Sequence, residues 1–258
     1  RYHKVTGVQT CALPISERDV NLFMAQIFDQ TERHQDMVNA MKKVISLNPE
    51  LNTDERNLLS VAYKNIVGSR RNGLRMIAAI IDHEVGRDNL ARVEQLQEYK
   101  KVILGELEAY CNELIALVDE KLLPAAKTPE SRVFYEKLKA DYYRYICESK
   151  PENDKQEPAS KAKECYANAM EISKNEIPPS RPTSLGLILN YSVFLYEILG
   201  QKNEAIDLAQ KTYNECSQIV DDNSDNSYSE ATMILQLLRD NVSLWTQEDN
   251  QPDRKSVV

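Results

Sequence analysis

Residues 128–150 read TPESRVFYEKLKADYYRYICESK, a stretch that has the marks of an amphipathic helix. Thr128 suits the N-cap, and Pro129 suits the first helical position because its missing N–H would be unpaired there in any case. Apolar side chains then recur every three or four residues, which is the spacing of one helix face. They are Val133, Phe134, Leu138, Tyr142 and Tyr145. The stretch therefore predicts a helix that ends near Lys150.

The same period extends outward in both directions. Asn52, with Glu55 three residues later, indicates an N-cap pairing that opens a long helix. Pro124 is expected to stop the helix before the opening stretch. The predicted helices are two short ones within 16–49, and then 52–83, 89–123, 128–150, 159–174, 183–199, 203–220 and 227–245. About nine helices without an alternating strand pattern predict an all-α fold, either a bundle or a solenoid.

Composition narrows the class of protein further. The 258 residues include only 7 glycines and 10 prolines, which argues against a sheet-rich fold. There are 32 basic and 40 acidic side chains, so a net charge of −8 argues against nonspecific nucleic-acid binding. The most apolar run, 185–200, contains Asn190 and Glu197 and is too short and too polar to span a bilayer. We expect a soluble protein that binds neither nucleic acid nor membrane.

The cysteines and the chain ends bear on compartment and domain limits. The 5 cysteines are scattered without a CxxC pair, which suits reduced thiols in the cytosol better than a zinc site or a disulfide framework. Residues 1–15 lack a helical period and are interpreted as a non-native leader. We expect one helical domain over 16–247 and a flexible, partly non-native tail over 248–258.

Support for catalysis is thin. The histidines are His3, His34 and His83, and the chain contains no nucleophile elbow, P-loop or Rossmann glycine motif. One acidic run, Asp221-Asp222-x-x-Asp225, could hold Mg²⁺ against a diphosphate, as in all-helical prenyl-transfer enzymes. Its asparagine and serine neighbours favour a solvated loop instead. The sequence therefore predicts no metal, no cofactor and no enzyme.

Basic residues on predicted helices form a more informative pattern. Lys64 and Arg71 are seven residues apart and share a helix face, with Arg75 one turn further. Arg144 is flanked by Tyr143 and Tyr145, and a guanidinium with a phenol hydroxyl suits a phosphate. On the pattern alone a solvated basic face and core tyrosines are the commoner explanation, so both interpretations stay open.

The last helices carry an apolar surface with amides beside it. Ile234, Leu237 and Asn241 lie on one stripe, and Leu189 and Val193 lie on another that adjoins Asn190. Core packing is the plainer interpretation. The alternative is an apolar groove wall whose amides bind an extended peptide, because an amide offers both a donor and an acceptor.

Four segments resemble the 14-3-3 family: RNLLSVAYKNI (56–66), RVFYEKLKADYYRY (132–145), LNYSVFLYEIL (189–199) and YSEATMILQLLRDNVSLW (228–245). The resemblance runs from Ser16 to Trp245. It implies nine antiparallel helices per subunit in a cup-shaped bundle with one amphipathic groove. It also implies a non-enzymatic adaptor that needs no cofactor and binds phosphorylated client proteins at R-S-x-pS-x-P-like segments. Such an adaptor would be a homo- or heterodimer in the cytoplasm, with the nucleus as a second location.

The resemblance assigns roles to single residues. Implied phosphate ligands are Lys64, Arg71, Arg144 and Tyr145; Asn190 and Asn241 would hold the ligand backbone. The implied groove wall is Leu189, Val193, Ile234 and Leu237, with Glu197 nearby. Implied dimer contacts are Ile27, Arg33, Asp36, Ile77, Tyr99 and Glu106. Val102 stands where the family often has a lysine that pairs with the residue at the Asp36 position, so the remaining pair is Arg33 with Glu106.

A second class of function stays open beside the adaptor. Residues 197–213, EILGQKNEAIDLAQKTY, resemble one tetratricopeptide unit, as in helical-repeat scaffolds that bind unmodified peptides. A true repeat array would show this period several times, and here it occurs once.

Overall fold

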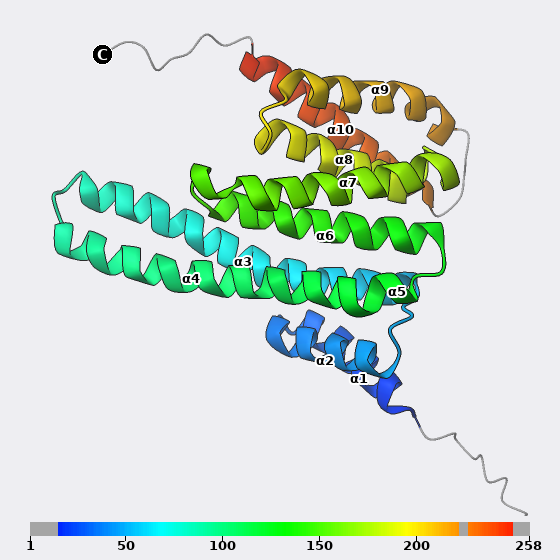
Figure 1. Cartoon of the computed structure of the whole chain (residues 1–258), viewed down its shortest axis with the longest axis horizontal. Coiled ribbons are helices and arrows are strands. Elements are labelled where there is room, and N and C mark those ends of the chain that lie inside the picture. The colour runs from blue at the N-terminus through cyan, green and yellow to red at the C-terminus, as the bar shows by residue number, and fades with distance from the viewer. Residues whose placement is uncertain (1–14, 222–226, 250–258) are drawn as a thin grey trace, which may run out of the picture. The chain divides into compact units, whose positions relative to one another are not determined.

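The computed structural model describes residues 15–221 and 227–249 and is helical almost throughout, with no strand in those ranges (Figure 1). The all-α prediction is therefore confirmed. Nine α-helices of 14 to 33 residues account for most of the described chain. The predicted tail from 250 onward and the leader, apart from Ile15, lie outside the described residues. The chain divides into two compact units, Arg1–Ala62 and Tyr63–Val258.

The helices follow one another through short connections. The first unit contains α1 (Glu17–Gln30), α2 (His34–Leu47) and the start of α3 (Thr53–Val85). The second contains the rest of α3, then α4 (Leu90–Leu117), a π-helical turn (Val118–Leu122), α5 (Leu123–Ala125), α6 (Pro129–Ser149), a 3-10 turn (Glu152–Asp154), α7 (Gln156–Glu176), α8 (Pro182–Glu197), α9 (Lys202–Asp221) and α10 (Ser227–Asp249).

In the first unit, α1 packs on α2, and the cap predicted at the start of α3 is present. Asn52 Oδ1 accepts from the Glu55 N–H at 3.0 Å, and Glu55 Oε2 accepts from the Asn52 N–H at 3.0 Å. Arg18 adds two hydrogen bonds to the same carboxylate, at 2.7 and 2.8 Å. Glu55 is buried, and these hydrogen bonds compensate its negative charge at close range.

Glu55 gives the first unit a pH-dependent stability. The hydrogen bond from Arg18 holds the pKa of Glu55 below its ordinary value, against the opposing effect of burial. A lowered folded-state pKa stabilises the fold above the unfolded pKa of about 4.3, and the contribution is lost as pH falls through the folded value. We expect Glu55→Gln to cost about 1–3 kcal/mol at pH 7, and the difference from wild type to shrink below about pH 4 in urea denaturation.

The matched control is Asp54→Asn, an exposed carboxylate on the same turn. It should change the free energy of unfolding by no more than about 0.5 kcal/mol. A Glu55→Gln penalty that is the same at pH 7 and pH 3 would contradict the electrostatic origin.

In the second unit, α6 packs against α7, and α8, α9 and α10 pack on one another. The largest side chains of this core are fully buried: Tyr63, Tyr135, Tyr166 and Phe194. Trp245 of α10 is buried and stacks on Tyr196 of α8, with ring centroids 4.6 Å apart and planes at 10°. This stack joins the end of α10 to α8.

Pro124 does not stop the preceding helix in the predicted way. The regular α-helix ends earlier, at Leu117, and the chain continues through the π-helical turn into α5. The Leu123 N–H donates to the Val118 carbonyl, five residues back, and proline at the next position has no N–H that needs an acceptor. The wider turn therefore accommodates Pro124, and the helical run ends just after it, at Ala125.

Four cysteines lie in the described part of the chain, and all are free thiols in the core. Burial raises the pKa of Cys147 to about 11 and the pKa of Cys111 and of Cys165 to about 12. Burial also raises the pKa of Cys216. Within the described ranges, no helix combines the length and the apolar content needed to cross a bilayer.

Candidate functional site

Two guanidinium groups meet on one carboxylate between α3 and α6. Arg71 Nε of α3 donates to Glu148 Oε2 at 3.0 Å, and a second, very short bond links Arg71 Nη2 to the same oxygen. Arg144 Nη1 of α6 donates to the other oxygen, Glu148 Oε1, at 2.9 Å. The structure thus brings Arg71 and Arg144, 73 positions apart in the sequence, to a common point.

The Tyr145 ring lies under both guanidinium groups. The Cζ atom of Arg71 is 4.2 Å from the ring centroid, and the Cζ atom of Arg144 is 4.7 Å from it. Burial, reinforced by the charge of Asp141, raises the pKa of Tyr145. The phenol therefore keeps its proton at neutral pH and can donate to an anion beside the two arginines.

Arg144 is the more deeply buried of the two arginines, with 8% of its surface exposed. Burial alone would lower its pKa, but the surrounding Tyr166, Asp141, Tyr145 and Glu148 outweigh that effect and raise it. Its Nε has no partner within the described residues. The anionic partners of Arg144 among the described residues are Glu148, at 2.9 Å, and Asp141, at 4.0 Å.

Lys64 and Glu197 flank this pair. Lys64 is exposed on α3, seven residues and therefore about 10 Å before Arg71 on the same face. Burial raises the pKa of Glu197, while the charges of Arg144, Arg71 and Arg75 act in the opposite direction. The end of α8 therefore lies within electrostatic reach of Arg71, Arg75 and Arg144.

Asp141, buried on α6, links this cluster to Asn190 on α8. Asn190 Nδ2 donates to both Asp141 oxygens, at 2.9 Å and 2.8 Å. Tyr166 of α7 donates to Oδ1 at 2.5 Å, Lys137 donates to Oδ2 at 2.9 Å, and Arg144 Nη2 lies 4.0 Å from Oδ1. Burial would raise the pKa of Asp141, but Lys137, Arg144 and Tyr166 together lower it, so the group is a carboxylate at neutral pH.

The predicted groove wall lies on α8 and α10. Leu189, Val193 and Ile234 are half-buried and pack on the core formed by α8, α9 and α10, whereas 46% of Leu237 is exposed. Ile234 Cδ1 lies 3.9 Å from the point that a Cβ atom on Gly186 would occupy, so the two helices are in close contact at this glycine. Asn241, half-buried on α10, follows Leu237 by one turn. The four apolar residues and both amides therefore come from two adjoining helices.

The predicted dimer residues are divided between the two units. Ile27, Arg33 and Asp36 lie in the first, where Arg33 bonds Asp36 within the chain. Ile77, Tyr99 and Glu106 lie in the second: Ile77 is buried, 57% of Tyr99 is exposed, and Glu106 accepts from Arg70 at 3.1 Å. Arg33 and Glu106 both have partners within the chain, so an ion pair between Arg33 of one subunit and Glu106 of another would require each to release its present partner.

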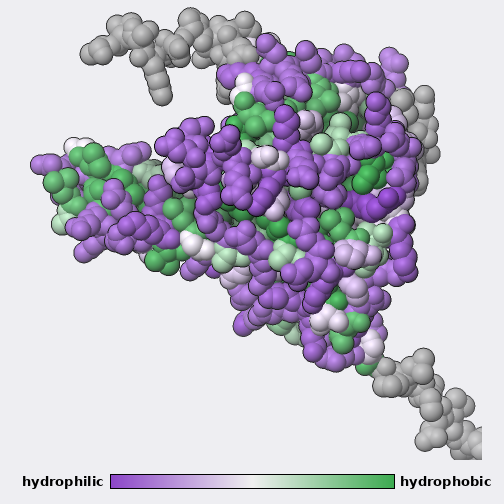
Figure 2. All heavy atoms as spheres, viewed as in Figure 1, coloured by the Kyte–Doolittle hydropathy of each residue, from purple (hydrophilic) through white to green (hydrophobic). Residues whose placement is uncertain are grey.

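Exposed apolar side chains collect on the α3–α4 hairpin, which projects at the left of Figure 2. Tyr99 is joined there by Met76, Ile80 and Val102, of which 66%, 44% and 55% are exposed. Val102, at the position that the resemblance marks as often lysine, adds to this surface. The hairpin thus exposes apolar side chains beside charged ones such as Glu98 and Lys101.

The structure adds little support for the other functional sites considered from the sequence. Asp222 and Asp225 of the acidic run lie outside the described residues, as does His3. No cluster of three or more histidine, cysteine, aspartate or glutamate side chains suited to a metal occurs within 15–221 and 227–249. His34 is half-buried on α2, and His83 is exposed, with Nδ1 3.6 Å from Glu84.

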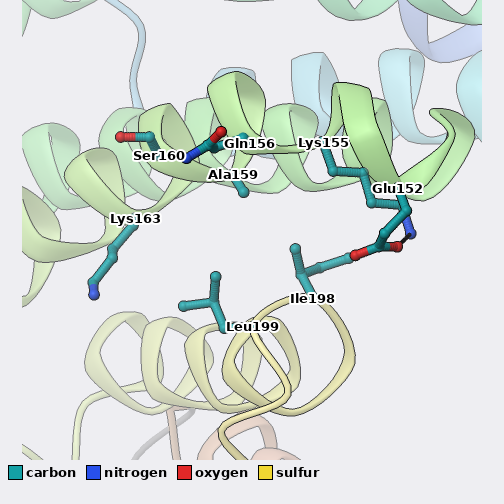
Figure 3. A pocket seen from close by; sticks show the side chains of 8 residues that line it. All are labelled: Glu152, Lys155, Gln156, Ala159, Ser160, Lys163, Ile198 and Leu199. Atoms are coloured by element: carbon teal, nitrogen blue, oxygen red, sulfur yellow. Dashed lines mark hydrogen bonds and ion pairs between the residues drawn. The ribbon is translucent and has the colours of Figure 1, made fainter.

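A separate hollow of about 360 Å³ lies between the start of α7 and the end of α8 (Figure 3). Lys155 and Lys163 line it on the α7 side, and Ile198 and Leu199 line it after α8. Lys155 is paired with Glu152 at 3.0 Å. None of the residues predicted to bind a phosphate or a peptide lines this hollow.

Sequence reasoning missed three residues of the site: Asp141, Glu148 and Tyr166. Two of them had a signal, because Asp141 and Glu148 lie three residues before and four residues after Arg144 and so share its helix face. Tyr166 comes from α7, and no spacing in the sequence could have connected it to Asp141.

Comparison with known proteins places this geometry in a family. The family model described as 14-3-3 protein matches residues 24–246. The chain is 42% identical over 231 residues to 14-3-3 protein 3 of Entamoeba histolytica, covering 90% of this chain and 96% of that protein. It is 40% identical over 236 residues to the 14-3-3-like protein GF14 epsilon of Arabidopsis thaliana, covering 92% and 93%. It is 43% identical over 233 residues to the checkpoint signal transducer rad25 of Schizosaccharomyces pombe, covering 90% and 86%.

Proposed function

This chain belongs to the 14-3-3 family, and from that premise we propose that it is a signalling adaptor that binds phosphoserine and phosphothreonine segments of client proteins. It acts by holding a client in a fixed conformation, and it has no catalytic activity or cofactor of its own. Its place is the cytoplasm, with the nucleus as a second location. Its clients carry R-S-x-pS-x-P-like segments.

The observation that carries the proposal is the convergence of Arg71 and Arg144 over Tyr145. A phosphate with about two negative charges matches two planar guanidinium forks and a phenol donor better than it matches a lone lysine. Lys64, on the same face of α3, adds a mobile ammonium. Together the four groups form a site for a dianion on an acidic protein.

The surface on α8 and α10 supports an extended peptide as the body of the ligand. Leu189, Val193, Ile234 and Leu237 offer apolar contact, and Asn190 and Asn241 offer hydrogen bonds to a main chain. An extended peptide exposes one N–H and one C=O at each residue, so amides are suitable partners. The phosphate would fix the register, and the wall would hold the flanking residues.

Titration of a fluorescent R-S-x-pS-x-P peptide and its unphosphorylated twin tests the proposal. We expect tight binding of the phosphopeptide alone and a loss of about 10- to 150-fold in Lys64→Glu, since charge-assisted hydrogen bonds contribute about 1.5–3 kcal/mol. The control is Lys163→Glu, an exposed lysine of α7 outside the cluster, which should bind normally. Equal affinity for both peptides would refute the adaptor and favour the helical-repeat scaffold.

We further propose that two chains form a homodimer or heterodimer through Ile27, Arg33, Asp36, Ile77, Tyr99 and Glu106. The exposed apolar residues of the α3–α4 hairpin support this, because such a surface in water usually marks an interface. Two grooves on one dimer would bind a doubly phosphorylated client with an avidity gain of about 10²–10⁴.

Introducing charge at this surface should separate the subunits. In Tyr99→Glu/Val102→Glu, two carboxylates would lose water on association, so we expect the mass measured by light scattering to fall to that of one chain. Ala116→Glu, at another exposed position of α4, is the control and should leave the mass unchanged. A double variant that keeps the dimer mass would place the interface elsewhere.

A further inference from the structure

We propose that the hollow between α7 and α8 is a second binding site, which takes a small carboxylate with a short aliphatic chain, such as a short-chain fatty acid. The hollow shares no lining residue with the candidate phosphopeptide site. The inference therefore goes beyond the proposed function and does not depend on it.

The hollow has the size of a small-molecule site. Its volume of about 360 Å³ lies at the lower end of the range for ligand pockets, about 300–1,000 Å³. It lies wholly within the second unit. The lining residues of α7 recur every three or four positions and so share one helix face: Gln156, Ala159, Ser160 and Lys163. A ligand would therefore lie along this face of α7.

The wall opposite α7 is apolar and held in place by its backbone. Ile198 and Leu199 face the α7 side chains (Figure 3), are half-buried and pack on the core that includes Phe194. The Leu199 N–H donates to the Phe194 carbonyl at 3.2 Å, and the Gln201 N–H donates to the Leu195 carbonyl at 2.9 Å. The hollow therefore presents a fixed apolar surface that the body of a ligand can cover.

The α7 side chains supply hydrogen-bond donors, and one of them is a cation without a partner. The Ser160 hydroxyl can donate to a ligand. Lys163 is exposed and has no ion-pair partner in the part of the chain that the structure describes. Lys155, farther along the lining, is already paired with Glu152 at 3.0 Å. The charge that remains for a ligand is thus positive, and it favours an anionic head at the Lys163 end of the hollow.

A carboxylate on a short chain matches these walls better than other simple ligands. An amine would meet Lys163 as a like charge, and an alcohol would leave the ammonium group without a counter-charge. Inorganic phosphate has no apolar body to cover the opposite wall. The lined face spans seven residues of α7, or about 10 Å, which suits a chain of about six carbons.

Methyl NMR spectra of the protein test the site with hexanoate, 1-hexanol and hexylamine, which share a chain length and differ in the head. We expect hexanoate to shift the methyl signals of Ile198 and Leu199 saturably, while Ile234 and Leu237 of the candidate groove stay unchanged. Hexanoate should bind about 1.4- to 5-fold more tightly than 1-hexanol, the range for an exposed ion pair of about 0.2–1 kcal/mol. Hexylamine should bind most weakly.

Two variants and a shorter acid locate the two ends of the ligand. Lys163→Gln should remove the preference for hexanoate over 1-hexanol and leave 1-hexanol binding unchanged. Its matched control is Lys174→Gln, at an exposed lysine near the other end of α7, which should keep the preference. Ser160→Phe fills the hollow from an exposed position and should abolish binding of all three probes. Butanoate should bind up to about 15-fold more weakly than hexanoate, since each buried methylene contributes about fourfold.

Circular dichroism and thermal melting establish that each variant is folded. If Ser160→Phe does not fold, the comparison of wild type with Lys163→Gln still decides the role of the charge.

The outcomes are distinct. Absence of a saturable shift at Ile198 and Leu199, or shifts confined to Ile234 and Leu237, overturns the site. Equal affinity for hexanoate and 1-hexanol, or an undiminished preference in Lys163→Gln, overturns the anionic class of ligand. Tighter binding of N-acetylleucine than of hexanoate would assign the hollow to peptide C-termini and overturn the choice of a free acid. The phosphopeptide titration is a separate measurement, so failure of the proposed function leaves this test intact.

Discussion

Arg144→Gln is expected to weaken phosphopeptide binding severely. The variant removes a charge that is 8% exposed and bonded to Glu148, and it leaves the phosphate with one guanidinium instead of two. Loss of one partner from a buried, hydrogen-bonded charge pair costs about 2–5 kcal/mol, or roughly 30-fold to several thousandfold in affinity. Titration by fluorescence anisotropy measures the loss, and melting curves establish that the variant is folded.

Two variants sharpen the Arg144 experiment. Arg132→Gln on the same helix removes an arginine that is also ion-paired, to Glu176 at 2.9 Å, but whose side chain is 40% exposed. It should bind the phosphopeptide normally. Arg144→Lys keeps the charge and loses the planar fork, so its affinity should fall between those of wild type and Arg144→Gln. Normal binding by folded Arg144→Gln would show that the phosphate lies elsewhere.

Trp245→Ala is expected to give the largest loss of stability. Trp245 is 4% exposed and stacked on Tyr196, so its removal takes away the contact between the end of α10 and α8 and leaves a cavity. Substitutions of this kind cost about 3–5 kcal/mol. Because α10 also carries Asn241, Ile234 and Leu237, we expect weaker phosphopeptide binding together with the lower urea midpoint. Far-ultraviolet circular dichroism should follow the unfolding, since the variant has no tryptophan left.

The neighbouring Leu244→Ala provides the control for Trp245. Leu244 is 53% exposed, and its truncation should change stability by no more than about 0.5 kcal/mol. Similar midpoints for the two variants would mean that the stacked rings contribute little to the docking of α10.

Local signals in the sequence predicted the elements well and their ends less well. The pairing of Asn52 with Glu55 and the capping role of Thr128 are confirmed, because each cap involves groups three residues apart in the chain. The helical run ends at Ala125, close to the predicted stop at Pro124, but its last part is a π-helical turn and a short α-helical turn that were not predicted. A proline excludes a regular α-helical hydrogen bond, but the π-helical turn before it removes the need for one, and no residue type announces that turn.

For the candidate site, too, the sequence predicted local features and missed contacts between helices. Spacing alone placed Lys64 and Arg71 on one helix face, and the charge and apolar patterns named the helices that carry the rest. The bridging of Arg71 and Arg144 by Glu148, and the linking of Asn190 to Tyr166 through Asp141, join residues from different helices. Such contacts depend on tertiary packing, and the spacing of residues along the sequence does not show which helices lie side by side.

The buried cysteines can serve as natural probes of local opening in the fold. With a pKa of about 11, Cys147 would be thiolate in about one molecule in ten thousand at pH 7, and burial shields even that fraction from an electrophile. Alkylation in the native state must therefore wait for the helix that carries the thiol to open. Cys111, Cys147, Cys165 and Cys216 lie on α4, α6, α7 and α9. Their separate labelling rates, resolved by mass spectrometry, would give an opening free energy for each of four helices without any engineered probe.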